Sequence, residues 1–212
     1  MKKPAEPPHD CPLCPRLAAF RDDNRRKHPD WFNAPVPCFG PLSAPLAIAG
    51  LAPGLQGANR TGRPFTGDWA GDLLYGTLLK LGMARGDYQE RADDTLKLMG
   101  CRIVNSVRCV PPQNKPEPSE IKTCRQFLIS ELEAMTNLKV ILALGKIAHD
   151  SVLKTLDARI ADHPFGHGTD YEMGKIRLIS SYHCSRYNTN TGRLTTPMFE
   201  DVVGKAKALA KI

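Results

Sequence analysis

The sequence has no apolar run long enough to cross a membrane, no low-complexity tract and no long internal repeat. A membrane-spanning helix needs about 20 predominantly apolar residues, and no apolar stretch of a signal peptide follows the two amino-terminal lysines. We therefore expect a cytoplasmic protein. A chain of 212 residues can bury one sizeable core, so we expect residues 1–212 to form a single domain.

Acidic residues are in deficit, with 22 Asp and Glu against 29 Lys and Arg, which gives a formal net charge of +7. The excess is uneven, because residues 176–212 are basic whereas residues 87–94 are acidic. A positive surplus favours a polyanionic partner such as nucleic acid. The carboxyl-terminal part is therefore the predicted phosphate-facing surface.

The seven cysteines come without a signal peptide, so a disulfide framework is not expected. Cys11 and Cys14 form a Cys-x-x-Cys pair that can hold one metal centre from a tight turn, and Cys109 and Cys124 can supply two further thiolates. In the alternative interpretation, all seven are small buried apolar residues, and Cys124 does lie on an apolar helical face. The residues alone leave both interpretations open.

Short apolar runs alternate with longer helical patterns, which predicts a three-layer α/β/α fold around a central, mainly parallel four-stranded sheet. The predicted strands are residues 46–50, 102–107, 139–144 and 176–181. The predicted helices are residues 69–82, 119–136, 145–156 and 195–212, with Ser119 as an amino-terminal cap and Pro197 at a first helical position.

Three polar features follow the predicted strands. The loop GLAPGLQGANRTGRPFTGD (50–68) follows the first, Asn105 stands toward the end of the second, and His183 follows the last. Separately, each has a structural explanation: a glycine-rich turn, an amide that satisfies backbone, a structural histidine. In an open α/β sheet, ligands bind at the carboxyl ends of the strands. The three together therefore predict a shared site.

The residue types limit the chemistry of that site. The loop lacks the G-x-x-x-x-G-K-[ST] pattern of a nucleotide phosphate cradle, but its glycines allow close approach of a flat ligand. Phe65 could stack on such a ligand, and Asn105 has the donor and acceptor needed to read a nucleobase edge. Cys184 adjoins His183, but adjacent residues of an extended segment point in opposite directions, which disfavours a Cys-His dyad.

Five segments together resemble the family 5 (type b) uracil-DNA glycosylases, an iron-sulfur branch of the uracil-DNA glycosylase superfamily. GLAPGLQGANRTGRPFTGD is similar to the first active-site motif of that family and SYHCSRYNTNTGRLT to the second. NSVRCVPPQNKP, CPLCPRL and WFNAPVPCFG match further segments, so the resemblance covers most of the chain. Family 4 enzymes usually have Glu where this chain has Leu51, which favours family 5.

The resemblance implies that Cys11, Cys14, Cys109 and Cys124 are the ligands of a [4Fe-4S] cluster. Its implied task is structural: it would fasten the amino terminus and the proline-rich loop at residues 111–119 to the core. Zinc accepts the same four sulfurs, so the sequence leaves that metal open.

The resemblance also implies an activity, namely monofunctional hydrolysis of the bond between deoxyribose and uracil in DNA, leaving an abasic site. Family members often accept other deaminated bases such as hypoxanthine. Ala52 and Phe65 would line the base pocket, Asn105 would read the base edge or hold the attacking water, and His183 would donate to the oxygen that gains negative charge. Asp68 would stabilise the cationic sugar and orient or deprotonate water.

Asp68 has an alternative role as the amino-terminal cap of the helix predicted at 69–82, and both roles could coexist.

The target nucleotide must leave the duplex before such a reaction, and the segment 188–195 is the predicted wedge for the vacated stack. The predicted DNA contacts are Arg60, Arg63, Arg186, Asn188 and Arg193. For any one arginine, an ordinary solvated charge is the alternative interpretation.

Two positions depart from the family pattern: Cys184 replaces the usual proline after the histidine, and Cys38 replaces a glycine. Loss of the proline frees φ at residue 184, so the loop of His183 could be looser. Two competing functions stay open: a non-catalytic iron-sulfur protein that recognises damaged or single-stranded DNA, and an electron-transfer protein. We expect a monomer.

Overall fold

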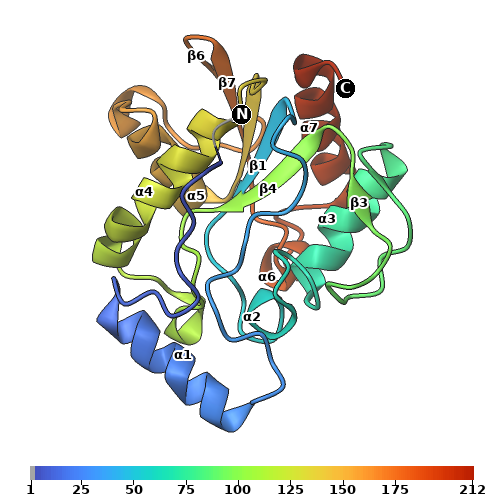
Figure 1. Cartoon of the computed structure of the whole chain (residues 1–212). Helices are drawn as coiled ribbons and strands as arrows, with labels where there is room; N and C mark the ends of the chain where they lie inside the picture. Colours follow the sequence, from blue (N-terminus) through green and yellow to red (C-terminus); the bar gives the residue numbers. More distant parts are fainter. Residues whose placement is uncertain (1–2) are drawn as a thin grey trace.

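The computed structural model describes residues 3–212 and is organised around a five-stranded sheet of order β4-β1-β5-β7-β6 (Figure 1). Four strands pair in parallel and the edge strand β6 pairs antiparallel to β7. The strands are β1 (Leu46–Gly50), β4 (Cys101–Asn105), β5 (Val140–Leu144), β6 (Asp170–Met173) and β7 (Ile176–Ser181).

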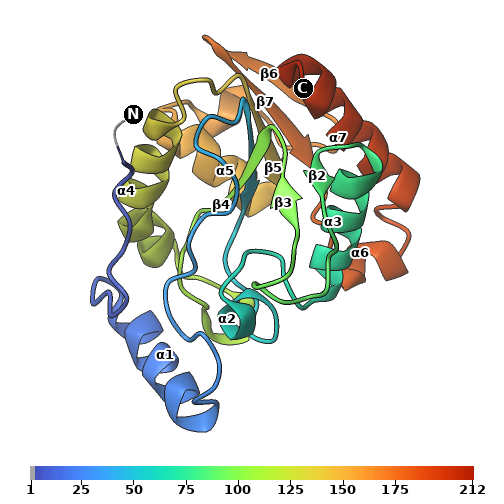
Figure 2. The ribbon, with the colours of Figure 1, turned by 45° about the vertical axis from the view of Figure 1, so that its right-hand side comes forward.

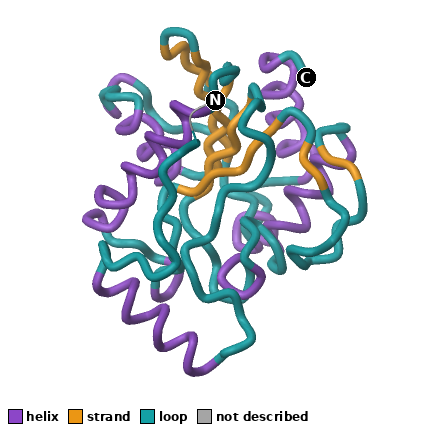
Figure 3. The backbone as a smooth tube through the Cα atoms, in the orientation of Figure 1, coloured by secondary structure: helices purple, strands orange, loops and turns teal. Residues whose placement is uncertain are grey.

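The prediction of a mainly parallel sheet is confirmed, but the prediction of four strands is wrong. The missed strand, β6, has the sequence DYEM, and none of its residues is buried. Its antiparallel edge position leaves it without the continuous apolar run that marks a strand buried on both faces. A separate two-stranded pair, β2 (Ala84–Arg85) with β3 (Lys97–Leu98), lies apart from this sheet (Figure 3).

Helices cover both faces of the sheet, which confirms the three-layer architecture (Figures 1 and 2). On one face, side chains of β1, β4, β5 and β7 pack with α3 (Trp69–Lys80) and α7 (Thr196–Ala210). On the other, alternate residues of the same strands pack with α4 (Pro118–Ala134) and α5 (Lys146–Thr155). Because both faces are covered, all five residues of β1, β4 and β5 are buried.

The four predicted helices are α3, α4, α5 and α7. Pro197, predicted at the first helical position, is the second residue of α7. The predicted cap of α4 is wrong. Glu117, not Ser119, precedes the helix and forms a capping box with Glu120. Pro118 at the first helical position starts the helix two residues earlier than a cap at Ser119 would.

Three helices and two 3₁₀ turns were not predicted. The helices are α1 (Pro15–Lys27), α2 (Ala58–Thr61) and α6 (Arg186–Asn190), and the turns are Pro112–Asn114 and Ile160–Asp162. α1 lies outside the three layers (Figure 2). Its buried side chains include two polar residues, Arg21 and Asn24, so its sequence lacks the apolar periodicity from which a helix is predicted. None of the helices in residues 3–212 is long and apolar enough to span a bilayer.

Candidate active site

A cavity of ≈ 690 Å³ lies at the carboxyl ends of β1, β4 and β7. Parallel pairing places Gly50, the last residue of β1, opposite Asn105, the last residue of β4. The glycine loop that follows β1 folds through α2 and returns to the start of α3. As a result, the five predicted catalytic and base-binding residues all line this one cavity: Ala52, Phe65, Asp68, Asn105 and His183.

Asp68 has both placements that the sequence predicted: it caps α3 and it lines the cavity. It is the amino-terminal cap of α3, and its Oδ1 accepts a hydrogen bond from the backbone N–H of Gly71 at 3.1 Å. Its Oδ2 lies against Gly54 and Gly57, and a Cβ at Gly57 would collide with it. The cap therefore uses one carboxylate oxygen, and the other lies beside the glycine loop at the cavity.

Asn105 is 5% exposed, and its Oδ1 is a buried acceptor with no hydrogen-bond partner within residues 3–212. A Cβ at Gly50 would collide with this Oδ1 and would lie 2.9 Å from the ring of Phe65. Gly50 therefore clears the space in which both side chains sit. Because leaving a buried acceptor unpaired costs about 1–3 kcal/mol, this oxygen is suited to receive a donor from a ligand.

Phe65 and His183 form the aromatic part of the cavity, with ring centroids 6.0 Å apart and an interplanar angle of 26°. Phe65 has φ +52°, a strained conformation for a residue other than glycine. Burial lowers the pKa of His183, and the negative charge of Asp68 acts in the opposite direction. The imidazole is therefore neutral at neutral pH and keeps one N–H donor.

Cys184 compensates for the missing proline with a side-chain contact. It is fully buried, and its Sγ donates to the carbonyl oxygen of Ala70 at 3.4 Å in the first turn of α3. Asn188 adds a second contact, since its Nδ2 donates to the carbonyl oxygen of His183 at 2.8 Å. Burial raises the pKa of the Cys184 thiol, and this side chain packs in the core while His183 lines the cavity. The two residues do not form a dyad.

The prediction that Arg63 contacts DNA is wrong. Its guanidinium is buried and donates to both carboxylate oxygens of Asp94 at 2.6 and 2.7 Å. It also lies 5.1–5.7 Å from the ring centres of Phe39, Tyr75 and Tyr88. Burial of Asp94 acts upward on its pKa, but the hydrogen bonds and charge of Arg63, together with hydrogen bonds from the backbone N–H groups of Gln89 and Leu96, lower it to about 2.

The buried pair therefore fixes the segment that leads into Phe65 and Asp68. The acidic stretch at 87–94 indicates acidic partners in the sequence but does not identify which arginine pairs with Asp94.

The other predicted DNA contacts stand at or near the surface. Arg186 lines the cavity and packs over the ring of Trp69 at 5.3 Å. Arg193 is exposed and packs over Tyr182 at 4.5 Å. Arg60 is exposed, but its Nε donates to the carbonyl oxygen of Gln56 at 2.8 Å.

Sequence reasoning missed three surface residues near the cavity. Trp69 lines it and is 44% exposed, and Tyr187 on α6 is 72% exposed beside Arg186. Asn114 also lines the cavity. No sequence pattern distinguishes an exposed aromatic residue from a buried one at these positions, and the turn that carries Asn114 has no periodic signal.

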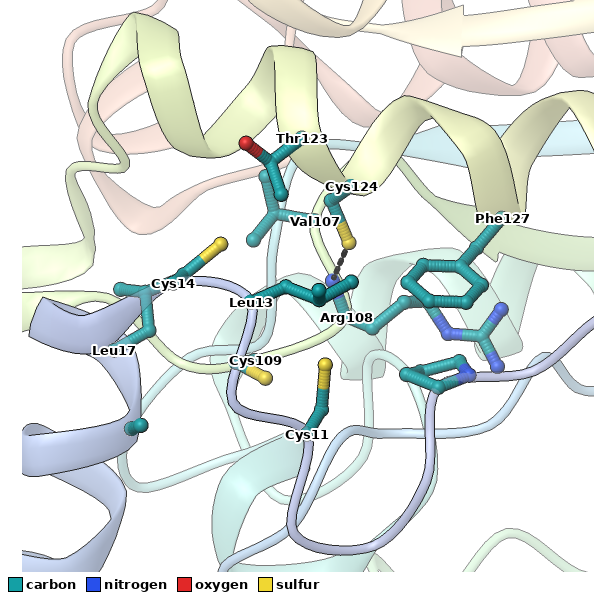
Figure 4. A pocket seen from close by; sticks show the side chains of 12 residues that line it. Cys11, Leu13, Cys14, Leu17, Val107, Arg108, Cys109, Thr123, Cys124 and Phe127 are labelled. Carbon is teal, nitrogen blue, oxygen red and sulfur yellow. Dashed lines mark hydrogen bonds between the residues drawn. The ribbon is translucent and has the colours of Figure 1, made fainter.

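Four cysteines line a second, apolar pocket (Figure 4). Cys11 and Cys14 come from the turn before α1, Cys109 from the segment after β4, and Cys124 from α4. The backbone N–H of Arg108 donates to the Sγ of Cys124 at 3.4 Å. Burial raises the pKa of Cys109 to about 12 and that of Cys124 to about 11.

Within residues 3–212, no three His, Cys, Asp or Glu side chains are placed closely enough to hold a metal ion as they stand. The four-ligand centre therefore stays a prediction, although the four predicted residues share one pocket. The other cysteines lie elsewhere: Cys101 and Cys184 are in the core, and Cys38 accepts a hydrogen bond from Arg108 at 3.0 Å.

Comparison with known proteins agrees with this arrangement. The model of the uracil DNA glycosylase superfamily matches residues 37–207. The chain is 44% identical to the type-5 uracil-DNA glycosylase of Thermus thermophilus over 94% of each protein. It is 38% identical to that of Pyrobaculum aerophilum, over 94% of this chain and 88% of the relative.

A type-4 uracil-DNA glycosylase of Archaeoglobus fulgidus is more distant, at 31% identity over 70% of this chain and 69% of the relative. The family-model match and the two type-5 relatives each cover most of the chain. The chain therefore belongs to the uracil DNA glycosylase superfamily, in its type-5 branch.

Proposed function

We propose that the protein is a DNA glycosylase that hydrolyses the N-glycosidic bond of uracil in DNA and leaves an abasic site. The observation that carries this proposal is the single cavity that Phe65, Asp68, Asn105 and His183 line together. Its members supply a stacking surface, a carboxylate, an unpaired amide acceptor and a neutral imidazole. All come from one chain, so we propose that a monomer with a single domain is sufficient.

Base recognition uses the two residues beside Gly50. The ring of Phe65 stacks on the extruded base. The unpaired Oδ1 of Asn105 accepts the N3–H of uracil, and its Nδ2 donates to a neighbouring carbonyl oxygen of the base. The cavity of ≈ 690 Å³ has room for a purine as well, which supports an extension of the proposal to other deaminated bases such as hypoxanthine.

Bond cleavage transfers the electron pair of the glycosidic bond into the uracil ring, and negative charge gathers on its carbonyl oxygens. The N–H of the neutral His183 imidazole donates to one of these oxygens. A single donor of this kind contributes about 3–4 kcal/mol in the transition state. The departing base then takes up a proton from solvent.

Asp68 acts on the sugar side of the bond. Its carboxylate stabilises the positive charge that develops on the deoxyribose and orients the water that attacks C1′. The water loses a proton to this carboxylate as the new C–O bond forms. The hydrogen bond from Gly71 to Oδ1 fixes the orientation of the carboxylate, so Oδ2 is the oxygen available for this work.

Access to the base requires extrusion of the nucleotide from the duplex, at a cost of a few kcal/mol. We assign the wedge to Tyr187, because it is the most exposed large apolar side chain on α6. Asn188, which begins the segment 188–195 predicted for this role, instead turns inward to the carbonyl of His183. Arg186 and Arg193 are available beside it for phosphates.

The four cysteines fit an iron-sulfur cluster in number and chemistry: four sulfurs in an apolar pocket, with a backbone N–H donor to one of them. When bound, a [4Fe-4S] cluster would be held by Cys11, Cys14, Cys109 and Cys124 and would cross-link the three segments that carry them. Zinc remains the competing occupant of the same sulfur set. No step of the hydrolysis passes through this centre.

The test is incubation of the protein, without added metal, with a labelled duplex that contains uracil opposite guanine, followed by alkaline cleavage of abasic sites. Strand cleavage only at the uracil position supports the proposal. No cleavage with uracil or hypoxanthine, together with intact DNA binding, would overturn it in favour of a recognition protein.

A further inference from the structure

His183 lies in the segment directly after β7, where the backbone pairing of the sheet stops. On one side, β7 pairs with β5 as far as Ser181. On the other side, the last backbone bond runs from the N–H of Gly168 to the carbonyl oxygen of Ser180 at 2.7 Å. Tyr182 lies beyond both, and in the part of the chain that the structure describes no backbone oxygen accepts its N–H. This donor, one residue before His183, therefore needs a side-chain acceptor.

His167 supplies that acceptor from the loop before β6. Its Nδ1 accepts the backbone N–H of Tyr182 at 3.2 Å. The rings of the two residues also stack, with centroids 5.1 Å apart and an interplanar angle of 25°. The hydroxyl of Ser181 lies 3.4 Å from the same nitrogen and donates to the carbonyl oxygen of Tyr182 at 2.8 Å. His167 is therefore attached to the end of β7 through both the backbone and a ring.

The contact fixes the form of the His167 imidazole. A backbone N–H can only donate, so Nδ1 carries a lone pair and the proton lies on Nε2. His167 is half-buried, and burial lowers its pKa, while a hydrogen bond with the backbone of Met198 acts in the opposite direction. The imidazole is therefore neutral at neutral pH and can accept this hydrogen bond.

Two further contacts limit the position of His183. The Nδ2 of Asn188 donates to its carbonyl oxygen at 2.8 Å, and a Cβ at Gly145 would lie 3.3 Å from its Cβ. Asn188 thus holds the backbone on the carboxyl side of His183, and the contact of His167 with Tyr182 holds it on the amino side. Such support matters because a reacting group must be held within about 0.5 Å of its productive position.

We propose that His167 is a positioning residue for the excision reaction: by accepting the N–H of Tyr182, it holds the backbone that directs the His183 imidazole into the cavity. His167 does not itself line the cavity, so it would touch neither the base nor the sugar. This inference rests on the proposed function, because it takes His183 as the donor to the departing base. Loss of the acceptor should therefore slow bond cleavage and leave DNA binding unchanged.

The test separates the acceptor from the ring. His167→Phe keeps an aromatic ring beside Tyr182 but has no acceptor. His167→Asn loses the ring but places Oδ1 at the position of Nδ1, so it can accept the same N–H. The matched control is His163→Asn, at a histidine of the same loop whose Nδ1 is hydrogen-bonded to the carbonyl oxygen of Arg159 and not to β7.

Three quantities are measured for each variant: the melting temperature, the Kd for a duplex with a stable abasic-site analogue, and the single-turnover excision rate of uracil at saturating protein. For His167→Phe we expect excision about 10-fold to 100-fold slower, because displacing a reacting group by about 1 Å costs up to about 100-fold. Its Kd should equal that of the parent. His167→Asn should recover most of the rate, and His163→Asn should keep all of it.

His167→Ala adds no atoms, so it replaces the phenylalanine variant if that variant does not fold, and its excision should be slowed to the same extent. The proposal would be overturned by a parent rate in His167→Phe and His167→Ala, by an equal loss in His167→Asn or in His163→Asn, or by a raised Kd that accounts for the slower excision.

A readout that needs no activity is the imidazole nuclear magnetic resonance signal of His183 in protein with isotope-labelled histidine, assigned through its loss in His183→Ala. This signal should shift in His167→Phe and return close to its parent position in His167→Asn. A parent protein that does not excise uracil would contradict the proposed function, whereas an unchanged His183 signal in His167→Phe would contradict the role of His167. The two failures are therefore distinguishable.

Discussion

The cavity at the strand ends and the cysteine pocket are both lined by residues of loops and helices, but they differ in the side chains that line them. Both collect residues far apart in the sequence. The cavity keeps polar atoms without partners, such as the Oδ1 of Asn105, beside a strained Phe65. The cysteine pocket is lined by sulfurs and apolar side chains such as Leu17 and Phe127. The first region is suited to receive a ligand, and the second to hold chain segments together.

The sharpest test of the cavity is Asp68→Asn. Asparagine is as good a helix cap as aspartate, so α3 and the melting temperature should be preserved. The negative charge and the proton acceptor are lost, so single-turnover excision should fall by about 10²–10⁴-fold. Asp68→Ala should lose excision and also about 1 kcal/mol of stability. Excision by Asp68→Asn at the parent rate would remove the carboxylate from the mechanism.

A second test leaves every proposed catalytic side chain in place. In Gly57→Ala the new methyl group would collide with the Oδ2 of Asp68 and displace the carboxylate. We expect about 100-fold slower excision, the cost typical of misplacing a reacting group by about 1 Å. Gly76→Ala in α3 is the control, because a Cβ there meets nothing within 4 Å. Equal rates for the two variants would contradict the assigned position of Asp68.

Exposed side chains near the cavity should contribute less to the excision rate than the side chains inside it. Tyr187→Ala removes the proposed wedge, so excision from a duplex with uracil opposite adenine should fall by about 10-fold, as expected for loss of one stacking contact. Excision from single-stranded DNA, which needs no extrusion, should stay within about twofold. An equal loss on both substrates would assign Tyr187 to general DNA binding instead.

The smallest effect on rate is expected from the cysteine pocket. Cys124→Ala should lower the iron content and reduce the melting temperature by about 10 °C, which corresponds to roughly 3 kcal/mol in a domain of this size. The single-turnover rate of the folded variant should stay within about threefold. Cys101→Ala, at a buried cysteine outside the pocket, should keep its iron. A variant that loses iron and keeps its melting temperature would contradict the structural role.

Prediction from the sequence was accurate where a single environment, such as burial on both faces of a sheet, determines the pattern of residues. β1 and β7 are found at their predicted residues, and β1 carries a continuous apolar run because it is covered on both faces. β6 was missed because an exposed edge strand lacks this pattern. The approximate grouping of Asp68, Asn105 and His183 followed from the rule that ligands bind at strand ends.

What could not be predicted depends on contacts between distant residues. Arg63 has the sequence character of a solvated charge, and only its pairing with Asp94 makes it a buried one. Similarly, nothing local shows that α6 exposes Tyr187 while Asn188 turns inward. Nothing local shows either that Arg16, about a hundred positions away along the chain, donates to the carbonyl oxygen of Lys115 beside the turn that carries Asn114.

The double placement of Asp68 has a consequence for how this protein can evolve. A substitution that removes its carboxylate also destabilises the start of α3 by about 1 kcal/mol, unless the new residue is itself a capping residue. Glutamate would keep the charge, but its extra methylene cannot satisfy Gly71 and the glycine loop in the same geometry. Most variants at this position therefore lose stability together with activity, so selection on the fold and selection on the reaction act on the same residue.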